Sequence, residues 1–345
     1  MNKRIVIVSA LLLFVTAVAL AQKPVVVMFY NVENFFDTIN DPDVNDEEFT
    51  PEGSNNWTGD KYYKKLANVE KVLFDIAKNN KTFPAVIGLS EVEVRSVLED
   101  IASTPSLKAA NYHIAHFDSR ERRGVDVAFL YRPDVFKIEG AYPHRATMPG
   151  YDDYKTRDIL GMWGTIEGEP FYFMVMHWSS RWGGKENSSY RREAAAAQVR
   201  QIADSVLAEN PATKVVIMGD MNDDPADKSI YEILGAKGKL KEVPENGYFN
   251  PYWAMHRAGY GSLGYQDQWN IFDNIIVSKN LVEANEGTLT LQKSPSDKRF
   301  YGNIFKAPYM IQKSGKYKGY PLRSFSGGAF IGGFSDHLPV YIIID

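Results

Sequence analysis

The segment Val-Val-Ile-Met-Gly-Asp-Met-Asn, residues 215–222, passes from an unbroken apolar run directly to polar side chains. An apolar run of this length favours a strand that is covered on both faces of its sheet. The polar residues Asp220 and Asn222 follow where that strand ends. Further apolar runs of the same kind predict strands at Val25–Phe29, Ala85–Leu89, Asp126–Tyr131, Phe171–His177, Phe272–Val277 and Leu338–Ile344.

Two amphipathic helices interrupt this series of strands. Apolar residues recur at helical spacing from Tyr62 to Ile76 and again from Ala195 to Val206, which places one apolar stripe on each helix. This order of elements predicts an α+β fold in which two sheets pack together and the helices lie outside. Segments 140–157, 245–270 and 295–332 are rich in Gly, Tyr and Pro, and we expect them to form long surface loops.

The composition excludes several kinds of site. The chain has 345 residues, no cysteine, 39 basic and 43 acidic residues, and a formal net charge of −4. Without cysteine there is no disulfide scaffold, thiolate zinc site, iron–sulfur cluster or cysteine nucleophile. The mild acidity argues against a strongly basic nucleic-acid groove. Because the sequence shows no repeat or low-complexity linker, we expect one domain over residues 22–345 and a monomer.

The first 21 residues have the pattern of a secretory signal peptide. Lys3 and Arg4 precede an uncharged apolar run, and Ala19-Leu20-Ala21 offers small residues for cleavage. We expect cleavage after Ala21, export to the periplasm or the extracellular space, and no stable membrane insertion afterwards. An uncleaved membrane anchor is the alternative.

Polar residues cluster just beyond the ends of the predicted strands. Any one of these signals alone is typical of a turn or a buried structural residue, so the argument depends on their joint occurrence. Carboxylates, amides and histidines at strand ends can meet at one rim of two packed sheets. Oxygen ligands without thiolates suit Mg²⁺ or Mn²⁺ better than zinc. The residues in these positions are Asn31, Glu33, Glu91, His177, Asp220, Asn222, Asp273, Asp336 and His337.

At these residues the sequence resembles the endonuclease/exonuclease/phosphatase superfamily, which has the deoxyribonuclease-I-like fold. The resemblance implies two mixed β-sheets in a four-layer α/β/β/α sandwich. Segments 122–132 and 156–160 are similar to a secreted bacterial branch of that superfamily. The motifs that carry the resemblance are Asn-Val-Glu-Asn at 31–34, Ser-Glu-Val at 90–92, His-Trp at 177–178, Gly-Asp-Met-Asn at 219–222, Asp-Asn-Ile-Ile at 273–276 and Ser-Asp-His-Leu-Pro at 335–339.

The resemblance also implies a role for each residue. Glu91 is the main ligand of Mg²⁺, with Mn²⁺ or Ca²⁺ as alternatives, and Asn31, Glu33 and Asp336 assist it. Several branches carry another residue in place of Glu33. The implied catalytic residues are His177, which contacts a phosphoryl oxygen or the leaving oxygen, Asp220 and Asn222, which position the nucleophile, and His337, which Asp273 orients.

Three arginines are candidate phosphate contacts, because a guanidinium group matches the geometry of phosphate. They are Arg123, Arg157 and Arg181. Each of them, judged alone, is typical of a structural or solvated arginine.

The sequence therefore predicts a metal-dependent hydrolase of phosphate esters, an endonuclease-like phosphodiesterase that binds nucleic acid weakly. A phosphatase or phospholipase-like diesterase acting on inositol phosphates or lipid head groups is the alternative. The acidic balance and the exposed aromatic side chains expected at Trp178, Trp182 and Trp253 favour that alternative. A non-catalytic binding module of the same fold is a third possibility, and the complete set of polar residues argues against it.

Overall fold

Two β-sheets form the centre of the molecule. The computed structural model describes residues 24–345, and the predicted signal peptide lies outside the described residues. The first sheet has the strand order β14 (Asn303–Ile304), β17 (Val340–Ile344), β1 (Val25–Phe35), β2 (Val86–Val92), β4 (Asp126–Tyr131) and β3 (His113–His116). The second has the order β5 (Phe136–His144), β6 (Ile159–Ile166), β7 (Glu169–His177), β8 (Lys214–Asp220), β13 (Asp273–Ser278), β10 (Tyr248–Phe249) and β9 (Ala236–Lys237).

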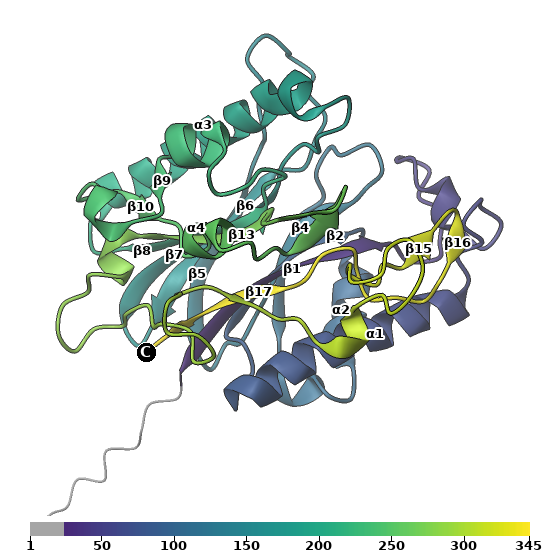
Figure 1. Cartoon of the computed structure of the whole chain (residues 1–345), viewed down its shortest axis with the longest axis horizontal. Helices are drawn as coiled ribbons and strands as arrows, with labels where there is room; N and C mark the ends of the chain where they lie inside the picture. The colour runs from purple at the N-terminus through teal and green to yellow at the C-terminus, as the bar shows by residue number, and fades with distance from the viewer. Residues whose placement is uncertain (1–23) are drawn as a thin grey trace, which may run out of the picture.

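Helices cover the outer faces of both sheets (Figure 1). Helices α1 (Gly59–Asn80) and α2 (Arg95–Ser103) lie on the first sheet, and α3 (Lys185–Glu209) lies on the second. Each sheet is mixed, because β1 and β2 run parallel, as do β7 and β8, while most other neighbours are antiparallel. The predicted four-layer α/β/β/α sandwich is confirmed.

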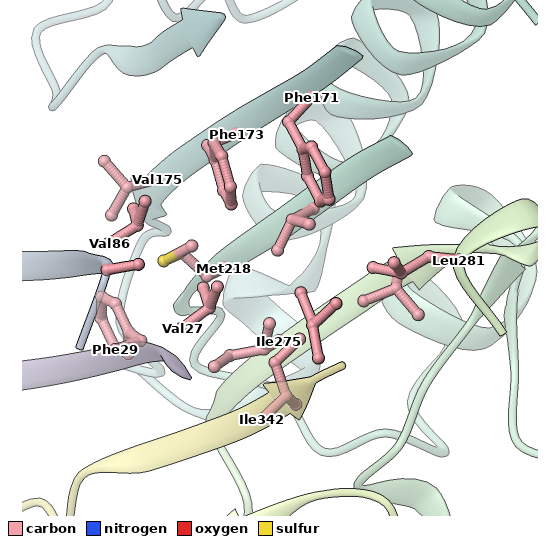
Figure 2. Close-up of a cluster of buried hydrophobic side chains, with 14 of the residues drawn as sticks. Val27, Phe29, Val86, Phe171, Phe173, Val175, Met218, Ile275, Leu281 and Ile342 are labelled. Carbon is pink, nitrogen blue, oxygen red and sulfur yellow. The ribbon is translucent and has the colours of Figure 1, made fainter. Parts of the chain in front are cut away.

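The core between the sheets is built from side chains that both inner faces contribute (Figure 2). Phe29 of β1 and Val86 of β2 face Phe173 of β7 and Met218 of β8, and all four are fully or almost fully buried. A Cβ atom at Gly88 would lie 2.5 Å from Sδ of Met218. Glycine is therefore needed there so that the two sheets can approach each other closely.

The predicted central strands are confirmed, but the predicted loops contain more regular structure than expected. The segment 140–157 begins inside β5, and 245–270 includes β10, the short helix α4 (Trp253–Arg257) and the hairpin β11 (Leu263–Tyr265) and β12 (Gln268–Asn270). The segment 295–332 includes β14 and the hairpin β15 (Phe325–Ser326) and β16 (Ala329–Phe330). Within residues 24–345, no helix combines the length and apolar character that crossing a membrane requires.

Candidate active site

Strand register brings three of the predicted catalytic residues side by side. His177 at the end of β7 pairs with Asp220 at the end of the parallel strand β8. Asp220 in turn pairs with Asp273, the first residue of the antiparallel strand β13. On the first sheet, Asn31 of β1 pairs with Ser90, directly before Glu91 of β2. Both sheets therefore deliver polar residues to the same rim of the sandwich.

Several site residues adopt a left-handed backbone conformation. The φ angles of Glu33, Asn34, Glu91 and Asn222 are +56°, +48°, +63° and +50°. Residues other than glycine rarely adopt this conformation, and it costs free energy that the surrounding structure must offset. The irregular register between β1 and β2 falls at the same place, between Asn31 and Phe35. The distortion turns the ends of both strands toward the rim.

Glu91 is held as an anion at the centre of the site. Asn31 Nδ2 donates hydrogen bonds to Glu91 Oε1 at 3.1 Å and to Asp220 Oδ2 at 3.0 Å. The backbone amide of Asn34 donates to Glu91 Oε2 at 2.7 Å. Burial alone would raise the pKa of Glu91, but the bond from Asn31 and the charge of Arg123 outweigh it and lower that pKa.

His337 is oriented by two carboxylates. Its Nδ1 lies 2.8 Å from Asp273 Oδ2, and its Nε2 lies 3.6 Å from Asp220 Oδ2. Ser262 Oγ donates to the same oxygen of Asp273 at 2.5 Å. Burial would lower the pKa of His337, but the charges of Asp273 and Asp220 raise it well above its usual value. The imidazole is therefore charged near neutral pH, with Nε2 toward Asp220.

His177 has the opposite protonation. Burial first, and then the charges of Arg157 and His337, lower its pKa well below the usual value. Arg157 Nη2 lies 3.2 Å from both ring nitrogens, and the arginine side chain is 11% exposed. Nε2 of His177 lies 3.5 Å from Asp220 Oδ2 and 3.9 Å from Glu91 Oε1. A neutral and a charged imidazole thus face the same carboxylate.

Asp220 is the carboxylate that faces both His177 and His337. The position before it, residue 219, requires glycine. A Cβ atom at Gly219 would lie 2.2 Å from the carbonyl oxygen of Met176 on β7. Burial raises the pKa of Asp220 to about 6, against the charge of His337. Asn222 donates its backbone amide to Asp220 Oδ1 at 2.9 Å and its side-chain amide to the carbonyl oxygen of Trp178 at 3.1 Å.

These residues line a cleft of about 1190 Å³. One wall is the β11–β12 hairpin, which is fixed to the site because Leu263 bridges to His337 and Leu338 donates its amide to Ser262. The exposed side chains of Tyr265 and Tyr317 line the same cleft.

Two of the predicted arginines line the cleft, and the third does not. Arg123 Nη1 donates to Asn34 Oδ1 at 3.0 Å, and Glu121 Oε1 lies 3.4 Å from Arg123 Nε and 3.8 Å from Arg157 Nη1. Arg181 is instead enclosed by carboxylates. Its Nη2 lies 3.3, 3.3 and 2.8 Å from oxygens of Asp223, Asp224 and Asp227. Its guanidinium group is therefore committed to structural ion pairs.

Glu33 shares a cationic partner with Asp336, another predicted metal ligand. Its Oε1 accepts from Arg323 Nε at 3.1 Å and its Oε2 from the amide of Ser324 at 2.6 Å. Burial, together with the charge of Asp336, raises its pKa to about 7. Arg323 also contacts Asp336, through Nη2 at 3.0 Å. The left-handed turn at Glu33 directs this carboxylate to Arg323, the same arginine that contacts the candidate ligand Asp336.

The aromatic residues divide between surface and core. Trp182 is exposed as predicted, whereas Trp178 is 3% exposed and packs in the core beneath α3, and Trp253 is half-buried. The prediction that Trp178 is exposed is therefore wrong, because it directly follows the buried end of β7.

Some functional residues were not predicted. Asn34 contacts Glu91, and Glu121 contacts both cleft arginines. Ser262 contacts Asp273, and Arg323 contacts Asp336. Asn34 belongs to the Asn-Val-Glu-Asn motif and could have been chosen. The other three lie in loops whose sequences carry no pattern that points to the site.

The oxygen-rich rim suits a hard divalent cation. Glu91 is anionic, Asn31 adds an amide, and Asp336 lies close enough for its charge to affect Glu91. Carboxylates and amides of this kind are typical ligands of Mg²⁺. Asp220, Asp273 and His337 also place ligand atoms within 4.8 Å of one another. The residues therefore fit the implied metal.

Comparisons with solved structures agree with this architecture. A zebrafish (D. rerio) TDP2 carrying 14 humanizing mutations is 14% identical, with a TM-score of 0.55, and covers 94% of this chain and 100% of its own. The human Nocturnin catalytic domain is 14% identical, with a TM-score of 0.52, covering 94% and 95%. A mannosyl-6-phosphatase from Bacteroides thetaiotaomicron is 14% identical, with a TM-score of 0.53, covering 93% and 99%.

At these identities the likeness concerns the fold alone. A search of curated proteins finds no match. The sequence profile described as the Endonuclease/Exonuclease/phosphatase family matches residues 26–345. This span includes every strand of both sheets except the first residue of β1, and all the residues placed in the site. The chain therefore belongs to the endonuclease/exonuclease/phosphatase family.

Proposed function

We propose that this phosphoesterase depends on Mg²⁺ and cleaves phosphodiester bonds in nucleic acid. The observation that carries the proposal is the pair of imidazoles of opposite protonation around Asp220, beside the anionic Glu91. Hydrolysis of a phosphate ester needs a base for water, donors for the phosphoryl oxygens and a counter-charge. This group of side chains offers all three at one rim.

Each side chain has a task that follows from its surroundings. Asp220 is the proton acceptor for the attacking water, because its pKa of about 6 lies near neutral pH. The charged Nε2 of His337 donates to a phosphoryl oxygen, and Asp273 keeps the ring in that orientation. Arg157, which lies beside His177, adds positive charge at the phosphate. Mg²⁺ bound at Glu91 would polarise the phosphoryl oxygen and neutralise its charge.

The cleft supports a nucleic-acid substrate through its aromatic wall. Tyr265 and Tyr317 are 61% and 47% exposed, so their rings are free to stack on bases. Few cations line the cleft beside them, namely Arg123, Arg157, Arg323 and Lys316. Binding to the phosphate backbone is therefore expected to be weak, and stacking carries more of the recognition.

A small phosphate ester is the second candidate. The β11–β12 and β15–β16 hairpins both line the cleft, and such walls suit a head group or a sugar phosphate as well as a strand. One of the proteins with a similar fold is a mannosyl-6-phosphatase. We also propose that the chain is an exported, monomeric single domain over residues 22–345, as its first 21 residues and its composition suggest.

A substrate panel tests the proposal. Purified protein is incubated with plasmid DNA, single-stranded RNA, inositol phosphates, sphingomyelin and mannose 6-phosphate, each with Mg²⁺, Mn²⁺, Ca²⁺ or chelator. We expect Mg²⁺-dependent nicking of the plasmid or cleavage of the RNA. Release of phosphate or phosphocholine from a small ester, without any cleavage of nucleic acid, would establish the second candidate instead.

A further inference from the structure

A second cluster of metal-ligating side chains lies on the first sheet, outside the set of catalytic residues. His116 is the last residue of β3, Asp126 is the first residue of β4, and Asp118 lies in the segment that connects them. Each offers one ligand atom, and these three atoms lie within 4.8 Å of one another. The antiparallel pairing of the two strands, with His116 opposite Ala128, brings the ends of the cluster together.

The imidazole of His116 is buried without a partner. Its side chain is 3% exposed, and its buried Nε2 has no hydrogen-bond partner among the described residues 24–345. Nδ1 faces Asp118 Oδ1 at 3.9 Å, which is too long for a hydrogen bond. A buried polar group without a partner costs free energy, and a bound cation would provide a ring nitrogen of His116 with one.

Asp126 adds a buried carboxyl group with no cation beside it. The residue is 3% exposed, and both of its oxygens accept from the backbone amide of Ser119, at 3.2 Å each. Burial, together with the neighbouring charges of Asp118 and Glu121, raises the pKa of Asp126 to about 7. No lysine or arginine within residues 24–345 forms an ion pair with this carboxylate. A bound cation would satisfy both Asp126 and His116.

We propose that His116, Asp118 and Asp126 bind a divalent transition-metal ion such as Zn²⁺, with a fourth position open to water. One imidazole and two carboxylates form a ligand set that zinc accepts in tetrahedral geometry. Ligands of a tetrahedral zinc ion lie about 3.4 Å apart, given bond lengths of about 2.0 to 2.1 Å. The separation of 3.9 Å between His116 and Asp118 is close to that spacing, and the exposed Asp118 side chain has room to adjust.

The ion would brace the segment that carries two cleft residues. Glu121 and Arg123 lie between Asp118 and Asp126, and Arg123 reaches the cleft to contact Asn34. The segment 117–125 connects β3 to β4. An ion bound at both ends of this segment would restrict the motion of the segment's backbone. The site thereby supports the cleft without contacting the substrate.

Cobalt binding tests this site with a readout that does not depend on hydrolysis. Full-length protein in excess Mg²⁺ is titrated with Co²⁺, and the visible absorption and the stoichiometry are recorded. His116→Asn is compared with His113→Asn, which changes an exposed histidine on the same strand. We expect the wild type and His113→Asn to bind one more Co²⁺ than His116→Asn, and Zn²⁺ to displace that ion. Equal stoichiometry and spectra in the three proteins would overturn the proposal.

A second variant keeps the test decisive if His116→Asn fails to fold. The side chain of Asp118 is 87% exposed, so Asp118→Asn should fold normally. Loss of a direct ligand should weaken Zn²⁺ binding at this site by at least about tenfold, because even residues that only orient a ligand have effects of that size. An unchanged Zn²⁺ dissociation constant in Asp118→Asn would also overturn the proposal.

Discussion

His177 and His337 approach the same oxygen from different elements: their Nε2 atoms lie 3.5 and 3.6 Å from Asp220 Oδ2. The two rings nevertheless differ in charge. Of the two histidines, only His337 contacts the carboxylate of Asp273, and only His177 contacts the guanidinium group of Arg157. The charged ring can donate to a phosphoryl oxygen while the neutral ring leaves Asp220 free to accept a proton. The two histidines therefore have different roles around Asp220, because Asp273 is the partner of one and Arg157 is the partner of the other.

Replacing His337 by alanine should lower the rate of hydrolysis by at least about 10², a typical scale for the loss of a positioned acid–base group. The change also removes the partner of Asp273, so Asp273→Asn with His337 intact should give a smaller loss. Steady-state kinetics on the best substrate of the panel measures both. A folded His337→Ala protein with wild-type turnover would make His337 a structural residue.

Glu91→Gln should abolish most activity and weaken Mg²⁺ binding. Glutamine keeps the size of the side chain but removes the negative charge that Asn31 and Arg123 stabilise. Isothermal titration with Mg²⁺ and rates over a range of Mg²⁺ concentrations provide the measurement, with Glu99→Gln on the exposed face of α2 as the control. If Glu91→Gln shows wild-type rates at every Mg²⁺ concentration, Glu91 is not a ligand of the metal.

Arg181→Met should destabilise the fold without changing the Michaelis constant. The substitution leaves the carboxylates of Asp223, Asp224 and Asp227 facing one another, so we expect a loss of about 2 to 3 kcal/mol in the free energy of unfolding. Arg157→Met should instead raise the Michaelis constant. Urea unfolding and kinetics on the two variants separate these roles. A raised Michaelis constant in a stable Arg181→Met protein would show that Arg181 contacts the substrate.

Glu93→Gln should flatten the dependence of stability on pH. Burial, and then the charges of Asp37 and Asp46, raise the pKa of Glu93 from 4.5 to about 8. Between these values the unfolded chain has released a proton that the folded chain keeps, so this residue makes stability fall as pH rises from 4.5 to 8. Glutamine remains neutral throughout, and it can accept from the amide of Asp37 as Glu93 does.

The comparison requires unfolding free energies of wild type and Glu93→Gln at several pH values from 5 to 8. The variant should gain stability relative to the wild type as pH rises. If the difference between the two proteins is the same at pH 5 and pH 8, the raised pKa is refuted. The exposed Glu48 provides a matched Glu→Gln control.

Salt should weaken nucleic-acid binding only modestly. With Arg181 committed to carboxylates, the cations left to neutralise phosphates are Arg123, Arg157, Arg323 and Lys316. Each neutralised phosphate of a duplex contributes about −0.9 to the slope of log affinity against log salt, so at most four contacts give a slope of about −4 or shallower. Binding of an uncleavable duplex at several salt concentrations measures it. A slope near −8 would contradict this count of contacts.

Local pattern was sufficient to predict the central strands and the residues at their ends. An apolar run such as 215–218 and the polar residues after it lie next to each other in the sequence, and strand register then aligned Asp220 with His177 and Asp273. The edge strand β5 and its neighbour β6 were not predicted. The apolar pattern of β5 is interrupted by Gly140, Pro143 and exposed residues, because only one side of this edge strand is paired.

Side-chain partners that are distant in sequence could not be predicted. The commitment of Arg181 to three aspartates depends on how the loop after β8 folds back, and spacing in the sequence does not encode that contact. The turn of Glu33 toward Arg323 depends on a left-handed φ angle. The sequence does not indicate this angle, because the residue is not a glycine. The family resemblance supplied the types of residue at the site, whereas the structure supplied their partners.

The pairing of β1 with β17 has a consequence for the synthesis of the protein. Ser335 Oγ donates to the carbonyl oxygen of Asn31, a contact between residues 304 positions apart, and Val25 pairs with Ile344. During translation Asn31 and Glu91 leave the ribosome long before Asp336 and His337 exist. A nascent chain cannot assemble the rim in stages, so hydrolytic competence should arise in one late step, when the final strand docks beside the first.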